Sequence, residues 1–219
     1  MALPPLLEPK DKEWLFKVTN KISTQPERDL CLLGYFLGTP MTTLEINRLQ
    51  LKDVLHKSGK LNKQFVIRGC QSFNGEDRKV FLLNKRLREL TLNYLSYRVK
   101  KNIGIGDNPD QYLGLDPYDA LFITAQGKGF SIVSKKTTTG APSYSCDALN
   151  RHIKKLLKSS GVENPSVLSG RRTFAVTLKR KGYDESYIHL LLGNKDWETT
   201  KKLLTSDPVN IGLIAAEAF

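Results

Sequence analysis

The feature that most constrains the fold is a hairpin signal between two short apolar segments. Residues 63–68 contain QFVIR, residues 79–83 read KVFLL, and Asn74-Gly75 lies between them. Asn-Gly between such segments favours an antiparallel hairpin, because both residues accept the backbone angles of a tight turn. Helical periodicity dominates on both sides. This order predicts an α+β fold: a mostly helical single domain with a small antiparallel sheet and no internal repeat.

Capping signals place several of the helices. Thr42 or Thr43 is expected to cap the helix before the hairpin, because Glu45 follows at the spacing of a capping box. Asn84 is expected to cap the helix after the hairpin. The other predicted helices begin at Asp11 or cover residues 26–37, 143–159, 171–181, 184–192 and 197–204.

The remaining segments are read as loops, a strand and two ends. Residues 102–119 are rich in Gly, Asp and Pro and predict a loop. LFIT at residues 121–124 predicts a short strand, and KKTTTGA at residues 135–141 a flexible basic linker. The expected organisation is a flexible N-terminal arm at residues 1–10, a folded domain at residues 11–205 and an apolar tail at residues 206–219.

The charge balance points to a polyanionic partner. The formal net charge is +12 and the isoelectric point is about 9.6. Lys and Arg side chains displace the counterions that condense on phosphates, so nucleic acid is the simplest partner. A basic protein without such a partner remains an alternative.

Other site classes find little support in the sequence. Cys31, Cys70 and Cys146 are odd in number and far apart, with no His at ligand spacing, so neither a disulfide framework nor a zinc site is predicted. No signal peptide and no apolar run long enough to span a bilayer are evident. The expected location is cytoplasmic, associated with the nucleoid in a prokaryotic host.

The C-terminal half resembles the catalytic domain of the tyrosine recombinase (phage integrase) family. The resemblance is carried by SGRRTFAVTLKRKGYDESYIHLLLGNKDWETTKKLL, residues 169–204. GTPMTTLEINRLQLKDV (residues 38–54), SFNGEDRKVFLLN (residues 72–84) and DALFIT (residues 119–124) are similar to earlier family segments, in the same order. The residues in step with the C-terminal motif are Arg171, Thr173, Phe174, Ala175, Gly182, Ile188, Leu192, Gly193, Thr199 and Thr200.

The resemblance implies a chemistry whose residues are largely missing here. In the family a Tyr attacks a DNA phosphodiester, two Arg stabilise the charge on the phosphate, a Lys protonates the leaving oxygen, and His residues assist. Only Arg171 is retained, with Arg172 beside it. The first Arg, the Lys, the two His positions and the Tyr fall at Thr42, Phe73, Leu168, Asn194 and Leu203. We therefore expect no catalytic residues, no enzymatic activity, no cofactor and no metal.

The resemblance also places double-stranded DNA against a helix expected to begin at Ser143. Arg171 is the strongest single candidate for a phosphate contact; the alternative is a buried Arg paired with a carboxylate. The helix could instead be a solvated basic helix with Ile153, Leu156 and Leu157 inward. The candidate DNA-binding residues are Ser143, Tyr144, Ser145, Asn150, Arg151, Lys154, Lys155, Arg171, Arg172, Arg78, Lys79, Lys135 and Lys136.

Three functions stay open from the sequence. The first is a non-catalytic, sequence-specific DNA-binding protein that serves a mobile element or plasmid. The second is an active breaking-joining enzyme with relocated residues, such as Tyr183 or Tyr187. The third is an interaction module for a recombinase, transposase or replication protein. Self-association through the tail, with Ile211, Leu213, Ile214 and Phe219, is a further expectation; packing on the same domain is the alternative.

Overall fold

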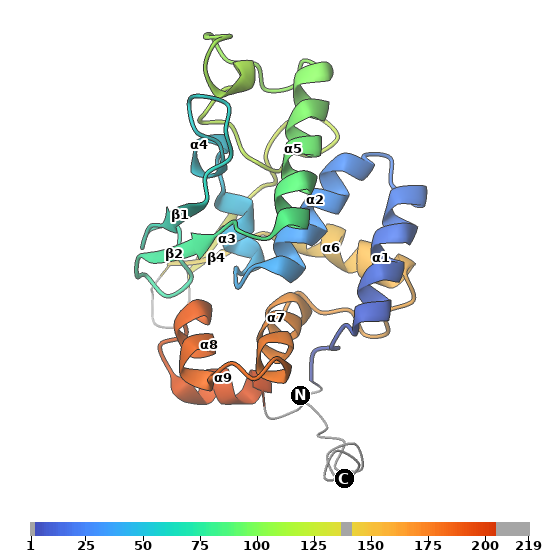
Figure 1. Cartoon of the computed structure of the whole chain (residues 1–219), viewed down its shortest axis with the longest axis vertical. Coiled ribbons are helices and arrows are strands. Elements are labelled where there is room, and N and C mark those ends of the chain that lie inside the picture. The colour runs from blue at the N-terminus through green and yellow to red at the C-terminus, as the bar shows by residue number, and fades with distance from the viewer. Residues whose placement is uncertain (1–2, 137–141, 205–219) are drawn as a thin grey trace.

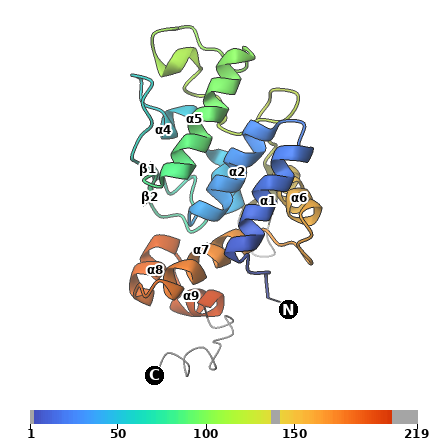
Figure 2. The same ribbon diagram turned by 45° about the vertical axis from the view of Figure 1, so that its right-hand side comes forward.

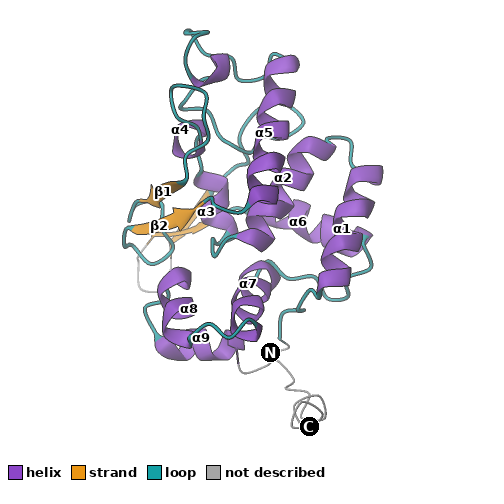
Figure 3. Ribbon diagram, in the orientation of Figure 1, coloured by secondary structure: helices purple, strands orange, loops and turns teal. Residues whose placement is uncertain are grey.

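A computed structural model describes residues 3–136 and 142–204 of the chain. The predicted α+β architecture is confirmed, with helices making up most of the regular structure (Figures 1 and 3). The helices are α1 Pro9–Ile22, α2 Pro26–Gly38, α3 Thr43–Arg48, α4 Leu51–Val54, α5 Lys85–Lys100, α6 Asp147–Ser159, α7 Ser169–Arg180, α8 Glu185–Leu192 and α9 Trp197–Leu204, with a 3₁₀ turn at Tyr112–Gly114. The strands are β1 Gln64–Ile67, β2 Arg78–Phe81, β3 Val133–Lys136 and β4 Pro142–Ser145.

Helix α2 is the centre of the main core. Its apolar run is buried on nearly every side, with Leu32, Leu33 and Tyr35 fully enclosed. Helices α1 and α5 lie alongside it (Figure 2), and α6 packs against α1 and α3. A helix that is apolar all round belongs in a protein interior, so this arrangement follows from the composition of α2.

Helices α7, α8 and α9 form a separate group at one end of the molecule (Figure 1). Their small core consists of Ala175, Ile188, Leu192 and Leu204. The group joins the main body where α7 crosses α2 at Gly170. A Cβ on Gly170 would lie only 2.2 Å from the carbonyl oxygen of Phe36, so this crossing requires glycine.

The capping and hairpin predictions hold. The side chain of Thr42 accepts a hydrogen bond from the backbone of Glu45, and the Glu45 carboxylate accepts one from the backbone of Thr42. Strands β1 and β2 are antiparallel and pair Gln64 with Phe81 and Ile67 with Arg78. Helix α3 ends at Arg48, and the short α4 follows separately.

The expected start of the basic helix at Ser143 is wrong. Ser143, Tyr144 and Ser145 lie on β4, which pairs antiparallel with β3, and α6 begins only at Asp147. Lys135 and Lys136, placed in the predicted linker, lie on β3. Residues 137–141 lie outside the described part of the chain. The alternation in Ser-Tyr-Ser suits a strand as well as a first helical turn, and the pairing with β3 decides between them.

The short strand expected at residues 121–124 is also wrong. Only a single bridge, between Ile123 and Gly129, forms there. The reason is Arg98 on α5, whose side chain donates hydrogen bonds to the carbonyls of Ala120 and Leu121. These carbonyls therefore bind a guanidinium where a sheet would offer the backbone of a neighbouring strand.

The described part of the expected N-terminal arm packs on the domain. Helix α1 begins at Pro9, two residues earlier than expected. Leu7 is buried, and its backbone N–H donates to the hydroxyl of Thr173 on α7. The predicted tail at residues 206–219, with Ile211, Leu213, Ile214 and Phe219, lies outside the described residues. None of the helices within the described ranges has the length and apolar character needed to cross a membrane.

Arg98 provides a test of how the long loop is held. This side chain is fully buried and also forms an ion pair with Asp119 in the loop. Arg98→Met should lower the free energy of unfolding by about 3–5 kcal/mol, because it leaves a partly buried carboxylate and several carbonyls without their donor. Arg86→Met on the same helix is the control: Arg86 is exposed and stacks on Phe16, so we expect a loss below ~1 kcal/mol. Urea unfolding measures both, and equal losses would contradict this account.

Candidate functional site

Arg171, which the resemblance matches to an arginine of the family motif, is buried on α7. Only 5% of it is exposed. Its Nη2 donates to the carbonyl of Leu192 at 2.9 Å and to Oδ1 of Asn194 at 2.7 Å. The amide of Asn194 in turn donates to the hydroxyl of Thr200 on α9, at 3.0 Å. The guanidinium thus holds the end of α8 and the start of α9 against α7.

Phe73, from the loop between β1 and β2, lies over this guanidinium. The Arg171 carbon Cζ is 4.6 Å from the centre of the Phe73 ring, and Cζ of Arg78 is 5.9 Å from it. A cation on an aromatic face is attracted by the quadrupole of the ring. Phe73 itself is 40% exposed. One aromatic side chain therefore separates two arginines from solvent.

Arg78 reaches the same place from β2. Its side chain is 8% exposed, and Nη2 lies 2.6 Å from Oε2 of Glu45. The same carboxylate oxygen accepts hydrogen bonds from the backbone and hydroxyl of Thr42. Gly193 makes the approach possible, since a Cβ there would lie 2.7 Å from Cδ of Arg78. The resemblance places the family's first arginine at Thr42, and the guanidinium of Arg78 shares a carboxylate with that residue.

We call Glu45, Phe73, Arg78, Arg171 and Asn194 the arginine cluster. Burial lowers the pKa of Arg171 to about 10, an effect that Arg78 reinforces and Glu45 opposes. Arg171 therefore stays charged at neutral pH. Two guanidinium groups and one carboxylate leave the cluster with one net positive charge.

Of the five positions where the resemblance places reactive groups, three meet at this cluster. Phe73 and Asn194 contact Arg171, and Thr42 shares the carboxylate of Glu45. Leu168 is half exposed just before α7, and Leu203 on α9 packs against the small core of α7–α9. The carboxylate of Glu45 and the guanidinium of Arg78 were not expected here, because a contact 33 residues apart in the chain leaves no local signal.

The other candidate DNA-binding residues differ in their location and in their exposure to solvent. Ser143, Tyr144 and Ser145 are on β4, whereas Asn150 faces α3 and accepts a hydrogen bond from Thr43 at 2.6 Å. Arg172 is buried and donates to the carbonyl of Pro4. The remaining candidates with described side chains are exposed: Lys79, Lys136, Arg151, Lys154 and Lys155.

Arg48, which no local sequence signal singles out, joins the two hairpins. It donates to the carbonyls of Cys70 and Gln71 in the loop after β1. Its Cζ also lies 4.9 Å from the ring centre of Tyr144 on β4. Tyr144 remains 47% exposed. Strand β4 therefore presents an exposed aromatic side chain that contacts a guanidinium group.

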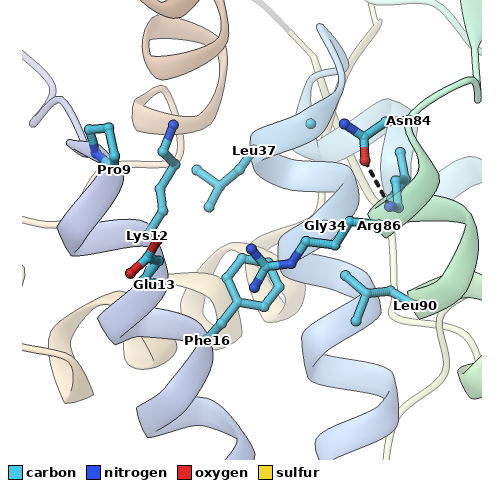
Figure 4. Close-up of a pocket in the computed structure, with 11 residues that line it drawn as sticks. Pro9, Lys12, Glu13, Phe16, Gly34, Leu37, Asn84, Arg86 and Leu90 are labelled. Carbon is cyan, nitrogen blue, oxygen red and sulfur yellow. Dashed lines mark hydrogen bonds between the residues drawn. The ribbon is translucent and has the colours of Figure 1, made fainter.

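A pocket of about 280 Å³ lies elsewhere, between α1, α2 and α5 (Figure 4). Phe16, Leu37 and Leu90 supply apolar surface, and Lys12 and Arg86 reach in from α1 and α5. Burial lowers the pKa of Lys12. The pocket shares no residue with the arginine cluster, and it takes no part in the function proposed below.

Solved structures share this fold. XerA recombinase matches with a TM-score of 0.69 and 19% identity, over 100% of this chain and 66% of that chain. XerH site-specific recombinase, bound to palindromic difH substrate in a post-cleavage complex, matches with a TM-score of 0.65 and 19% identity, over 98% and 53%. The Tn1549 transposon integrase, in complex with transposon right-end DNA, matches at 0.61 and 14%, over 99% and 66%.

The chain thus has the fold of a tyrosine recombinase catalytic domain, as the resemblance predicts. It spans between about half and two thirds of the length of these proteins. No protein-family model matches the sequence, and no curated protein matches it.

Proposed function

We propose that this protein binds double-stranded DNA without cutting it, as a sequence-specific factor for a mobile element or plasmid. The XerH and Tn1549 structures contain DNA on the same fold, and the net charge of +12 suits a polyanionic partner. Exposed Lys79, Arg151, Lys154 and Lys155 supply backbone contacts, which position a protein without reading bases. Tyr144 and Ser143 on β4 are the proposed base-reading residues.

One observation carries the proposal that the protein does not cut. The guanidinium of Arg171 is covered by the ring of Phe73 and bound by Asn194. Phosphoryl transfer needs positive charge open to the phosphate and a proton donor beside the leaving oxygen. Phenylalanine donates no proton, and Leu203, at the position of the nucleophile, cannot attack phosphorus. Losing several members of one catalytic unit removes nearly all of its rate enhancement.

A nicked duplex that traps covalent intermediates tests both halves of the proposal. Gel shifts at low salt should show binding, and denaturing gels should show no protein–DNA adduct on the same bound substrate. An active recombinase on its own nicked site is the positive control. An adduct would instead support the breaking-joining alternative, and its loss in Tyr183→Phe or Tyr187→Phe would identify the nucleophile. Absence of binding at low salt would contradict DNA recognition.

Selection from random duplexes tests sequence specificity. We expect an enriched site for the unmodified protein and a weaker preference for Tyr144→Ala. Tyr118→Ala is a matched control, because Tyr118 is also exposed and stacked under a cation, Lys52, but belongs to the loop at residues 102–119. Equal loss of preference in both variants would count against base reading by β4.

A further inference from the structure

We infer that the pocket between α1, α2 and α5 binds a small carboxylic acid with an apolar body, in its ionised form. This inference goes beyond the proposed function and does not depend on it, because none of the candidate DNA-binding residues lines the pocket. The volume of about 280 Å³ lies at the lower end of the range of small-molecule sites. One small ligand therefore suits this space.

The floor of the pocket is apolar, and a glycine in the middle of α2 keeps it open. A Cβ on Gly34 would lie 3.0 Å from Cδ1 of Leu87 and 3.1 Å from Cδ1 of Leu90. A larger side chain at Gly34 would therefore displace these leucines or fill the space beside them. Leu37 and Phe16 complete the apolar surface. Covering this surface favours a ligand with an apolar body.

Two cations reach over this floor from opposite walls. Arg86 extends from α5 until its Cζ lies 4.4 Å from the centre of the Phe16 ring on α1, and Lys12 lies one turn earlier on α1 (Figure 4). No acidic side chain of the described ranges forms an ion pair with either cation. A guanidinium offers paired N–H donors to a carboxylate, and an ammonium offers three more. A carboxylate above Phe16 would thus find donors on two sides.

The surroundings of Lys12 favour an anion over a cation. Burial lowers the pKa of Lys12, and the charge of Glu8 opposes this effect. Lys181 and Arg180, at the end of α7, lower the same pKa further. The charged form of Lys12 is therefore disfavoured in the unbound protein, and a bound carboxylate would compensate it. A cationic ligand would instead add to the repulsion.

The lining also distinguishes a carboxylate with an apolar body from an inorganic anion. Phosphate would leave the apolar surface of Phe16, Leu37 and Leu90 uncovered. Glu13, the one acidic residue among those that line the pocket, would repel a second negative charge on the ligand. A monocarboxylate with an aromatic or alkyl body meets both conditions.

A titration of the full chain, labelled with ¹⁵N, with 3-phenylpropionate tests this site by NMR. The amide signals of Gly34 and Gly38 should shift, because both residues line the pocket. The signal of Gly127, in the turn after Thr124, should stay in place. The neutral 3-phenylpropionamide has the same body without the charge. We expect it to bind about tenfold more weakly, because it cannot form charge-assisted hydrogen bonds with the two cations.

Two variants assign the charge recognition to named side chains. Lys12→Met keeps the apolar stem and removes the ammonium group, so the dissociation constant of 3-phenylpropionate should rise about tenfold. Lys17→Met is the matched control: Lys17 is exposed on the same helix, does not line the pocket, and changes the net charge equally. Glu13→Gln removes the acidic group of the lining and should lower the dissociation constant about threefold.

The proposal is overturned if the amide binds as tightly as the carboxylate, or if Lys12→Met and Lys17→Met bind the carboxylate equally well. Absence of a shift at Gly34 with both 3-phenylpropionate and octanoate, up to about 10 mM, would also overturn it. Equal shifts of Gly34 with inorganic phosphate would contradict recognition of an apolar body. No DNA is present in these titrations, so their failure leaves the proposed function intact.

Discussion

Raising the salt concentration from 50 to 200 mM should weaken binding to duplex DNA by about a thousandfold. This estimate assumes roughly six phosphate contacts, each of which releases counterions, so that the logarithm of the affinity falls by ~0.9 per contact for each tenfold rise in salt. Fluorescence anisotropy with a labelled duplex measures the slope. A nearly flat salt dependence would mean that the net charge of +12 serves another purpose.

Two adjacent lysines test whether the slope comes from the proposed surface. Lys154 and Lys155 are exposed on α6, and replacing both with Ala should lower the slope by about 2. Lys100 and Lys101, at the far end of α5, form an equally exposed adjacent pair. The double Ala variant of this pair has the same net charge as the Lys154 and Lys155 variant. Its salt slope should differ from that of the unmodified protein by less than the ~0.9 of a single phosphate contact. Equal effects of the two pairs would indicate nonspecific attraction without a defined interface.

Gly170→Ala should lower the free energy of unfolding by about 3–5 kcal/mol, although it removes no hydrogen bond or ion pair. The added Cβ would lie 2.2 Å from the Phe36 carbonyl oxygen and 2.8 Å from the Phe36 ring. The backbone of α2 cannot yield as a flexible side chain does, so α7 must move away from α2. Denaturant unfolding, monitored by circular dichroism, measures the loss.

The same substitution at Gly38 is expected to change the free energy of unfolding in the opposite direction. Gly38 ends α2, and a Cβ there would meet only a side-chain atom of Leu87, at an ordinary 3.8 Å. Gly38→Ala should stabilise the protein by about 0.5 kcal/mol, because alanine loses less backbone entropy on folding. Opposite effects of the two Gly→Ala substitutions on the free energy of unfolding would locate the destabilisation at the crossing of α7 and α2. A loss at Gly38 as large as that at Gly170 would contradict it.

Local signals predicted the elements that local interactions decide. The capping box of Thr42 and Glu45 depends on residues close in the chain and forms as expected. The hairpin also forms, but Asn74-Gly75 lies within the longer loop of residues 68–77 and does not join the two strands directly. Strand β4, Pro142–Ser145, was missed because a short Ser-Tyr-Ser segment also suits the first turn of a helix. Only the pairing with β3, which precedes the undescribed residues 137–141 in the chain, distinguishes a strand from a helix here.

The resemblance pointed to Arg171 in the sequence, but it did not indicate most of the side chains that surround this residue. The family motif located Arg171, and it placed Phe73 and Asn194 at positions that prove to contact it. The motif carried no information about Arg78, whose contact with Glu45 joins a strand to a helix. The burial of Arg172 against Pro4 likewise depends on a segment 168 residues away. Such contacts follow from the tertiary fold, and propensity and spacing cannot indicate them.

The small separate core of α7–α9 has a consequence for how long the arginine cluster persists. Among the described residues, four fully buried apolar side chains form the core of this group, with Phe174, Leu178 and Leu203 packed against them, far fewer than in the main body. A unit of this size opens at a lower free energy than the whole domain, as one cooperative step. When α8 and α9 open, Arg171 loses both oxygens that orient it, while α2 and α5 stay folded. Exposure of the Arg171 guanidinium is then set by local opening of these two helices, because global unfolding is the rarer event.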